Sequence, residues 1–222
     1  MSPAYSALFA LLVVSASTLP AHAQGASELP VALDGNALVY EALGHRLAWP
    51  LPDWAAGAGT SGATLSDFLS ASVSETAGQS SLELFPKGES AGFWTTLYGA
   101  RITAPGDMPL TQLRQAVVNV YARACKPETV AIFQLEPDNG DAIPPLGFVC
   151  GAYLDGIPAF SGKGEIMVVG FHRTDAGIGM VYQEWRGAAF DPEDATTWPV
   201  APAVIEARFA QFKSEVTFQR AD

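Results

Sequence analysis

The residues best equipped for chemistry lie in one short stretch, GMVYQEWRG at positions 179–187, where a carboxylate, an indole and a guanidinium follow one another. Its apolar residues indicate a β-strand. Strand alternation places side chains on opposite faces: Val181, Gln183 and Trp185 on one, and Met180, Tyr182, Glu184 and Arg186 on the other. Because neither face is purely polar, we expect a scaffold strand covered on both sides, whose polar end lines a groove. A binding face and a catalytic site remain alternatives.

A second polar group, HRTD at positions 172–175, lies where a strand ends and a turn begins. If the flanking strands pair around residues 174 and 175, this group lies at the turn. The residues 184–186 then lie near the opposite end of the hairpin. A hydrolase triad combining the two groups is therefore geometrically strained.

Metal and cofactor motifs are not found in the sequence. His45 and His172 are far apart and show no zinc-ligand spacing. The acidic stretch 138–141 lacks the alternating ligands of a calcium loop and is better explained as a turn, and the acidic stretch 191–194 as a solvated loop. Gly-rich residues 161–164 lack the spacing of a phosphate-binding loop. We expect no metal and no cofactor.

The start of the chain has the pattern of an export signal. A compact apolar run at residues 7–14 precedes an A-x-A cleavage pattern that ends at Ala23, although the first five residues carry no Lys or Arg. The prediction is a signal peptide over 1–23, a flexible leader over 24–37 and a single domain over 38–222. The expected location is periplasmic or secreted, where Cys125 and Cys150 would pair as a disulfide rather than remain free thiols.

The remaining pattern predicts strands interrupted by two amphipathic helices. Apolar residues recur at helical spacing over 109–125, and again over 203–212. Two short strands around Gly44 suggest an N-terminal hairpin that extends the domain. Most predicted strands connect through short turns, which favours an α+β class: a central antiparallel sheet with helices packed on its faces.

Charge narrows the choice of partners. The chain has 222 residues and a formal net charge of −11, and residues 1–23 contribute none of it. An acidic chain is repelled by nucleic-acid phosphates and by anionic lipid headgroups. We therefore expect no nucleic-acid partner and no membrane insertion after signal cleavage. The oligomeric state is left open by the sequence.

The order of elements over about residues 80–218 carries a family resemblance. A Trp-led strand follows LFPKGES, a helix ends in Cys125, a strand carries Cys150, and GEIMVVGFHR leads into GMVYQEWRG. This order resembles small secreted proteobacterial proteins of the Mog1/PsbP-like superfamily. The resemblance implies an α/β/α sandwich and a binding or assembly role rather than catalysis.

Together these features favour a non-catalytic exported protein that binds a partner protein or an envelope component. The candidate binding residues are Trp49, Trp54, Glu184 and Arg186, because aromatic side chains are common interface anchors. For Trp49 and Trp54 the alternative is that their rings cap the core. The alternatives are an envelope hydrolase that uses carboxylates such as Glu184 or Asp175, and a module that binds a small ligand.

Overall fold

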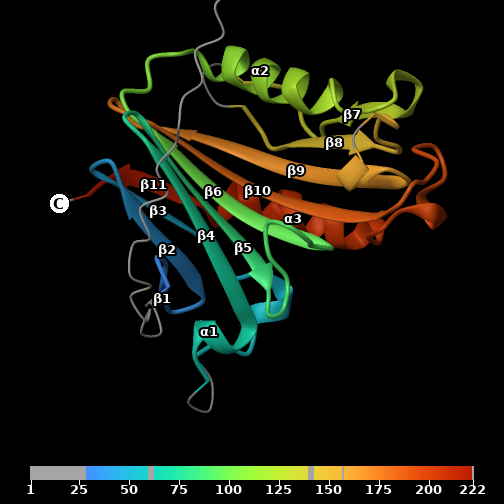
Figure 1. Ribbon diagram of the computed structural model, residues 1–222. Helices are drawn as coiled ribbons and strands as arrows, with labels where there is room; N and C mark the ends of the chain where they lie inside the picture. The colour runs from blue at the N-terminus through green and yellow to red at the C-terminus, as the bar shows by residue number, and fades with distance from the viewer. Residues whose placement is uncertain (1–28, 60–62, 140–142, 157, 222) are drawn as a thin grey trace, which may run out of the picture.

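The computed structural model describes residues 29–59, 63–139, 143–156 and 158–221 (Figure 1). In this part of the chain, eleven strands form two antiparallel sheets, accompanied by three α-helices. The strands are β1 (Ala32–Asp34), β2 (Ala37–Ala42), β3 (His45–Pro50), β4 (Leu69–Thr76), β5 (Gln79–Pro86), β6 (Thr96–Thr103), β7 (Val130–Phe133), β8 (Leu146–Cys150), β9 (Lys163–Arg173), β10 (Ile178–Ala188) and β11 (Thr217–Arg220). The helices are α1 (Leu65–Phe68), α2 (Leu110–Ala122) and α3 (Pro202–Ser214).

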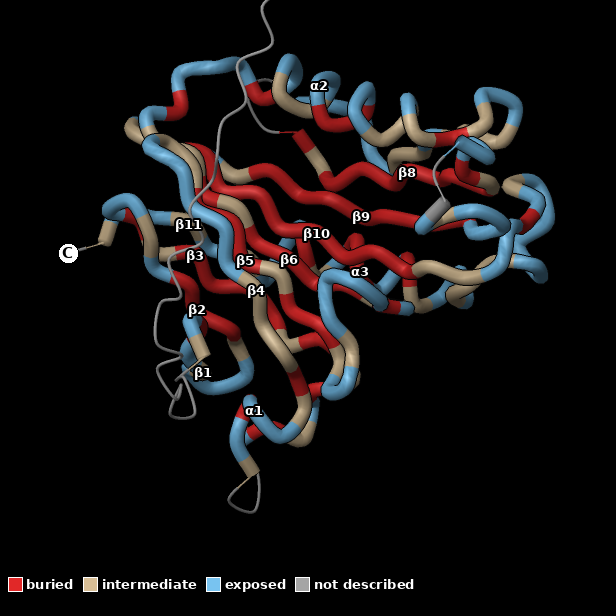
Figure 2. Tube along the Cα trace, in the orientation of Figure 1, coloured by how far each residue is buried: buried red, intermediate tan, exposed pale blue. Residues whose placement is uncertain are grey.

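The larger sheet has seven strands in the order β4-β5-β6-β10-β9-β8-β7, which makes β10 its central strand. The GMVYQEWRG stretch therefore pairs on both sides, with β6 and with β9. Val181 and Trp185 face one apolar core, and Met180 and Tyr182 face the other. Figure 2 shows β9 and β10 as almost continuously buried strands. The predicted burial of this strand on both faces is confirmed.

A close approach at Gly99 on β6 supports this central position. Gly99 is the register partner of Tyr182. A Cβ atom at position 99 would come within 2.1 Å of the Tyr182 ring. Because only glycine leaves room there, the ring lies flat across β6 and fills the layer beneath α2.

The expected α+β class, with helices covering both faces of one sheet, is wrong. Helix α2 lies over one face of the large sheet, near β8 and β9. The opposite face is covered by α3 together with a second sheet of four strands, in the order β1-β2-β3-β11. Strands thus dominate the described residues, and much of the main core lies between two sheets.

The predicted N-terminal hairpin exists, but it is not an extension. Strands β2 and β3 pair as expected, and β11 from the C-terminal end pairs with β3 to enlarge this second sheet. The side chains of Leu38, Leu47 and Trp49 enter the main core. A pairing between the two ends of the chain leaves no local signal in sequence, which is why the second sheet was missed.

The boundary between leader and domain also needs correction. Within the segment 24–37, expected to be flexible, Ala32–Asp34 forms β1 and pairs with β2, and Val31 is buried. The predicted signal peptide over 1–23 lies outside the described residues. Among the helices that the structure describes, none is long and apolar enough to cross a membrane.

Candidate functional site

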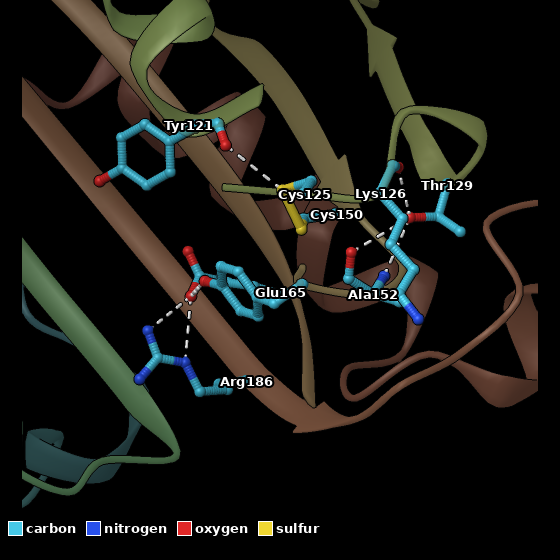
Figure 3. Close-up of a disulfide and its surroundings, with 9 residues drawn as sticks. Tyr121, Cys125, Lys126, Thr129, Cys150, Ala152, Glu165 and Arg186 are labelled. Carbon is cyan, nitrogen blue, oxygen red and sulfur yellow. Dashed lines mark hydrogen bonds and ion pairs between the residues drawn. A yellow bond between two sulfur atoms is a disulfide. The ribbon is translucent and has the colours of Figure 1, made fainter. Parts of the chain in front are cut away.

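The disulfide fixes the end of α2 against the large sheet. Cys125 follows α2 and Cys150 ends β8, and the two sulfurs are bonded at 2.07 Å, as predicted (Figure 3). Cys150 is the register partner of Glu165 on β9. Glu165 in turn is the register partner of Arg186 on β10. The cross-link therefore holds the helix end beside a pair of opposite charges.

Glu165 and Arg186 form a nearly buried ion pair. The Nη2 and Nε atoms of Arg186 donate to Glu165 Oε2 at 2.8 and 3.1 Å, and the hydroxyl of Tyr153 donates to the same oxygen (Figure 3 shows the Arg186 contacts). The side chain of Arg186 is 12% exposed and that of Glu165 is 3% exposed. A carboxylate with three donors in a dry environment is held rigidly, so Glu165 serves as an anchor.

Glu184 lies next to this pair and is 4% exposed. Its Oε1 accepts a hydrogen bond from the hydroxyl of Tyr121 on α2 at 2.6 Å. Burial raises the pKa of Glu184 well above its usual value, and the charge of Glu165 and a hydrogen bond between the two carboxyls raise it further. Burial likewise raises the pKa of Tyr121. Glu184 therefore keeps its proton to a higher pH than an exposed glutamate.

The side chains of Glu165, Glu184 and Arg186 form the polar base of a cavity of about 300 Å³ between α2 and the large sheet. Aromatic rings form much of its wall, and the guanidinium of Arg186 lies 3.5 Å from the ring centroid of Trp94 and 4.3 Å from that of Phe160. The exposed side chain of Val120 stands at its rim. The lining residues are Glu83, Ala91, Trp94, Leu97, Val120, Tyr121, Ala124, Tyr153, Phe160, Glu165, Glu184 and Arg186. We call this cavity the α2 pocket.

The four predicted binding residues do not share one surface. Glu184 and Arg186 line the α2 pocket. Trp49 is 0% exposed, because it points inward from β3 into the core between the two sheets. Trp54 is half-buried against the same core and contacts Tyr98 edge-on. The position of Trp49 therefore agrees with the alternative that it caps the core, and its ring offers no exposed contact.

The histidines and Asp175 lie away from the α2 pocket. His45 stacks on Phe218 and hydrogen-bonds Thr174 at 3.0 Å. Burial lowers the pKa of His172 to about 4. Asp175 pairs with Arg220 on the surface. Across the described ranges, no group of three or more His, Cys, Asp or Glu is arranged to hold a metal ion.

Sequence reasoning missed the carboxyl at the centre of this arrangement, Glu165. The signal lay in the hairpin register: Arg173 pairs with Ile178, so the turn is centred one residue later than expected. That shift brings Glu165 opposite Arg186 rather than two positions away. Tyr121, Tyr153 and Trp94 come from separate segments, and no local pattern joins them.

No protein-family model matches this sequence, and no curated protein resembles it at a significant level. Neither result bears on the resemblance to the Mog1/PsbP-like superfamily.

Proposed function

We propose that this protein is an exported, non-catalytic binding protein that receives one small polar group of an envelope component or partner in the α2 pocket. The observation that supports this most is the cluster of Glu165, Glu184 and Arg186 at the base of a cavity with aromatic walls. Binding sites of this type combine an apolar wall with a few fixed polar groups that set the orientation of the ligand.

The contacts favour binding over turnover. Glu165 is occupied by Arg186 and Tyr153, so it has little freedom to act as a base or a nucleophile. Among the residues that the structure describes, no histidine, lysine, serine or cysteine lines the pocket. A rigid polar base of this kind can orient a ligand without transforming it.

Export is the second part of the proposal. A cross-link between Cys125 and Cys150 is typical of proteins in oxidising compartments. Together with the signal-like N-terminal pattern, it supports a periplasmic or secreted location. Detection of the cleaved chain in a periplasmic extract would test this directly.

The pocket is tested with small probes that carry groups common in cell envelopes. Saturation-transfer NMR would be measured with N-acetylglucosamine, ethanolamine and glycerol on the purified oxidised chain. We expect at least one probe to bind. We expect Ala124→Trp, which places an indole in the cavity, to weaken that binding at least tenfold.

The matched control is Ala207→Trp, which adds the same side chain at an exposed position of α3. This variant should bind like the wild type. If no probe binds, or if Ala124→Trp binds as well as Ala207→Trp, the α2 pocket is not the binding site.

One observation favours a second candidate function, an envelope hydrolase. A protonated Glu184 beside Glu165 is the arrangement from which a general acid can act. For a hydrolase, Glu184→Gln would retain ligand binding and lose turnover of the bound compound. Recovery of the bound probe unchanged after long incubation with the wild-type chain would argue against this candidate.

A further inference from the structure

A second group of polar side-chain atoms lies on the face of the large sheet that packs against β3 and α3, away from the α2 pocket. Among the described residues, five buried side-chain nitrogen or oxygen atoms have no hydrogen-bond partner. One belongs to His172. The other four belong to residues around Tyr98: Trp49 Nε1, Trp54 Nε1, Gln183 Oε1 and Arg208 Nε.

All four residues lie against the ring of Tyr98 or beside it. The ring centroids of Trp49 and Trp54 are 6.3 and 6.1 Å from that of Tyr98. The Cζ atom of Arg208 lies 4.9 Å above the Tyr98 ring. Gln183 is the register partner of Tyr98 on β10, with its side chain on the same face. We call this set the Tyr98 cluster.

Tyr98 itself cannot satisfy these atoms. Its hydroxyl donates to the carbonyl oxygen of Pro50 at 2.7 Å and accepts from Arg208 Nη1 at 3.0 Å. Burial raises its pKa, so the hydroxyl stays protonated. The unpartnered atoms therefore remain three N–H donors and one carbonyl acceptor, and buried polar groups of this kind normally have a partner.

The charge of Arg208 is also poorly balanced. Its side chain is 1% exposed, whereas that of its partner Asp53 is 71% exposed, at a distance of 3.4 Å. Glu215, the other carboxylate that acts on Tyr98, is exposed as well. Solvent weakens the effect of both carboxylates on a cation inside the core. A buried guanidinium with a free N–H favours an anion close by.

We propose that the Tyr98 cluster is an internal binding site for a small planar oxyanion of the carboxylate or bicarbonate type. Such an ion accepts hydrogen bonds from the two indoles and from Arg208 Nε. A single water molecule accepts only two hydrogen bonds, so it leaves one of the three donors unpaired. The site is independent of the α2 pocket, because it lies on the opposite face of the large sheet.

The indole N–H signals of the ¹⁵N-labelled oxidised chain test this proposal without any substitution. The chain contains five tryptophans. On titration with sodium formate or sodium bicarbonate, we expect two indole signals to move downfield and to saturate. The signals of Trp94, Trp185 and Trp198 should stay in place. Trp54→Phe removes one of the two moving signals and so assigns it.

Sodium chloride at equal ionic strength is the salt control, and Arg208→Gln is the test variant. We expect chloride to have no effect, and the variant to bind formate at least tenfold more weakly. Lys213→Gln, which removes an exposed cation from the same helix, should bind formate like the wild type. Equal responses to all three salts would overturn the proposal. The proposal would also be overturned if formate and bicarbonate left the indole signals unchanged and those signals showed magnetisation transfer only from bound water.

Discussion

Removal of the disulfide should destabilise this protein by an amount that the loop length sets. Cys125 and Cys150 are 25 residues apart, and a cross-link of that span restricts the unfolded chain by about 3.5 kcal/mol. Both side chains are also buried beneath α2. Replacing each with alanine should cost about 1 kcal/mol more for lost packing. We therefore expect the double variant Cys125→Ala/Cys150→Ala to lose about 5.5 kcal/mol.

The assay is urea unfolding of the oxidised wild type, the reduced wild type, the double variant and the single variant Cys125→Ala. The reduced protein keeps its sulfur atoms, so it should lose only the cross-link contribution, about 3.5 kcal/mol. For a domain of this size, that loss lowers Tm by about 7–14 °C. The m-value should rise in every form without the cross-link, because the freed unfolded chain exposes more surface.

The single variant Cys125→Ala separates the two contributions. It lacks the cross-link but keeps the sulfur of Cys150, so it should lie between the reduced protein and the double variant. A loss below about 1 kcal/mol in the double variant, with an unchanged m-value, would refute the reasoning. That result would mean that the unfolded chain gains no freedom when the cross-link is removed.

Two further predictions concern packing and acid stability. Gly99→Ala should destabilise the protein by about 2 kcal/mol, because the new methyl group overlaps the Tyr182 ring. Chemical unfolding of Gly99→Ala/Tyr182→Leu should show a smaller cost for the same methyl group, and equal costs in both backgrounds would contradict the contact. Burial depresses the pKa of His172 from 6.5 to about 4. The stability that neutral His172 contributes is therefore fully present above pH 6.5 and is lost as the pH falls through 4. Between pH 7 and pH 4 the free energy of unfolding of the wild type should fall by up to about 3 kcal/mol more than that of His172→Gln. Chemical unfolding at each pH measures this difference, and parallel curves for the two proteins would contradict the prediction.

Local patterns were the reliable part of the sequence analysis. Helical periodicity located α2 and α3 to within a few residues, and period-two alternation placed Val181 and Met180 on opposite faces of β10. These succeeded because the burial of one stripe or face constrains residues that are close in the chain.

Two strands were missed for identifiable reasons. Strand β4 is rich in serine, and its side chains from Val73 to Thr76, next to the turn into β5, are exposed at the edge of the sheet, so it lacks an apolar pattern. Strand β1 is three residues long and is held mainly by its pairing with β2. Edge strands need little burial, so their sequences carry little signal.

By itself, the sequence determined the elements with a periodic apolar face, the pairing of the only two cysteines and the two-sided burial of the central strand. Tertiary structure alone decided that a second sheet covers the first, that Glu165 meets Arg186, and that unpaired donors gather around Tyr98. The physical reason is the separation of the interacting residues along the chain. Periodicity in the sequence records which side of a helix or strand is buried. The pairing of β3 with β11, and the contact of Arg208 with Tyr98, join segments that are far apart in the chain. Such pairings depend on the summed packing of the whole core.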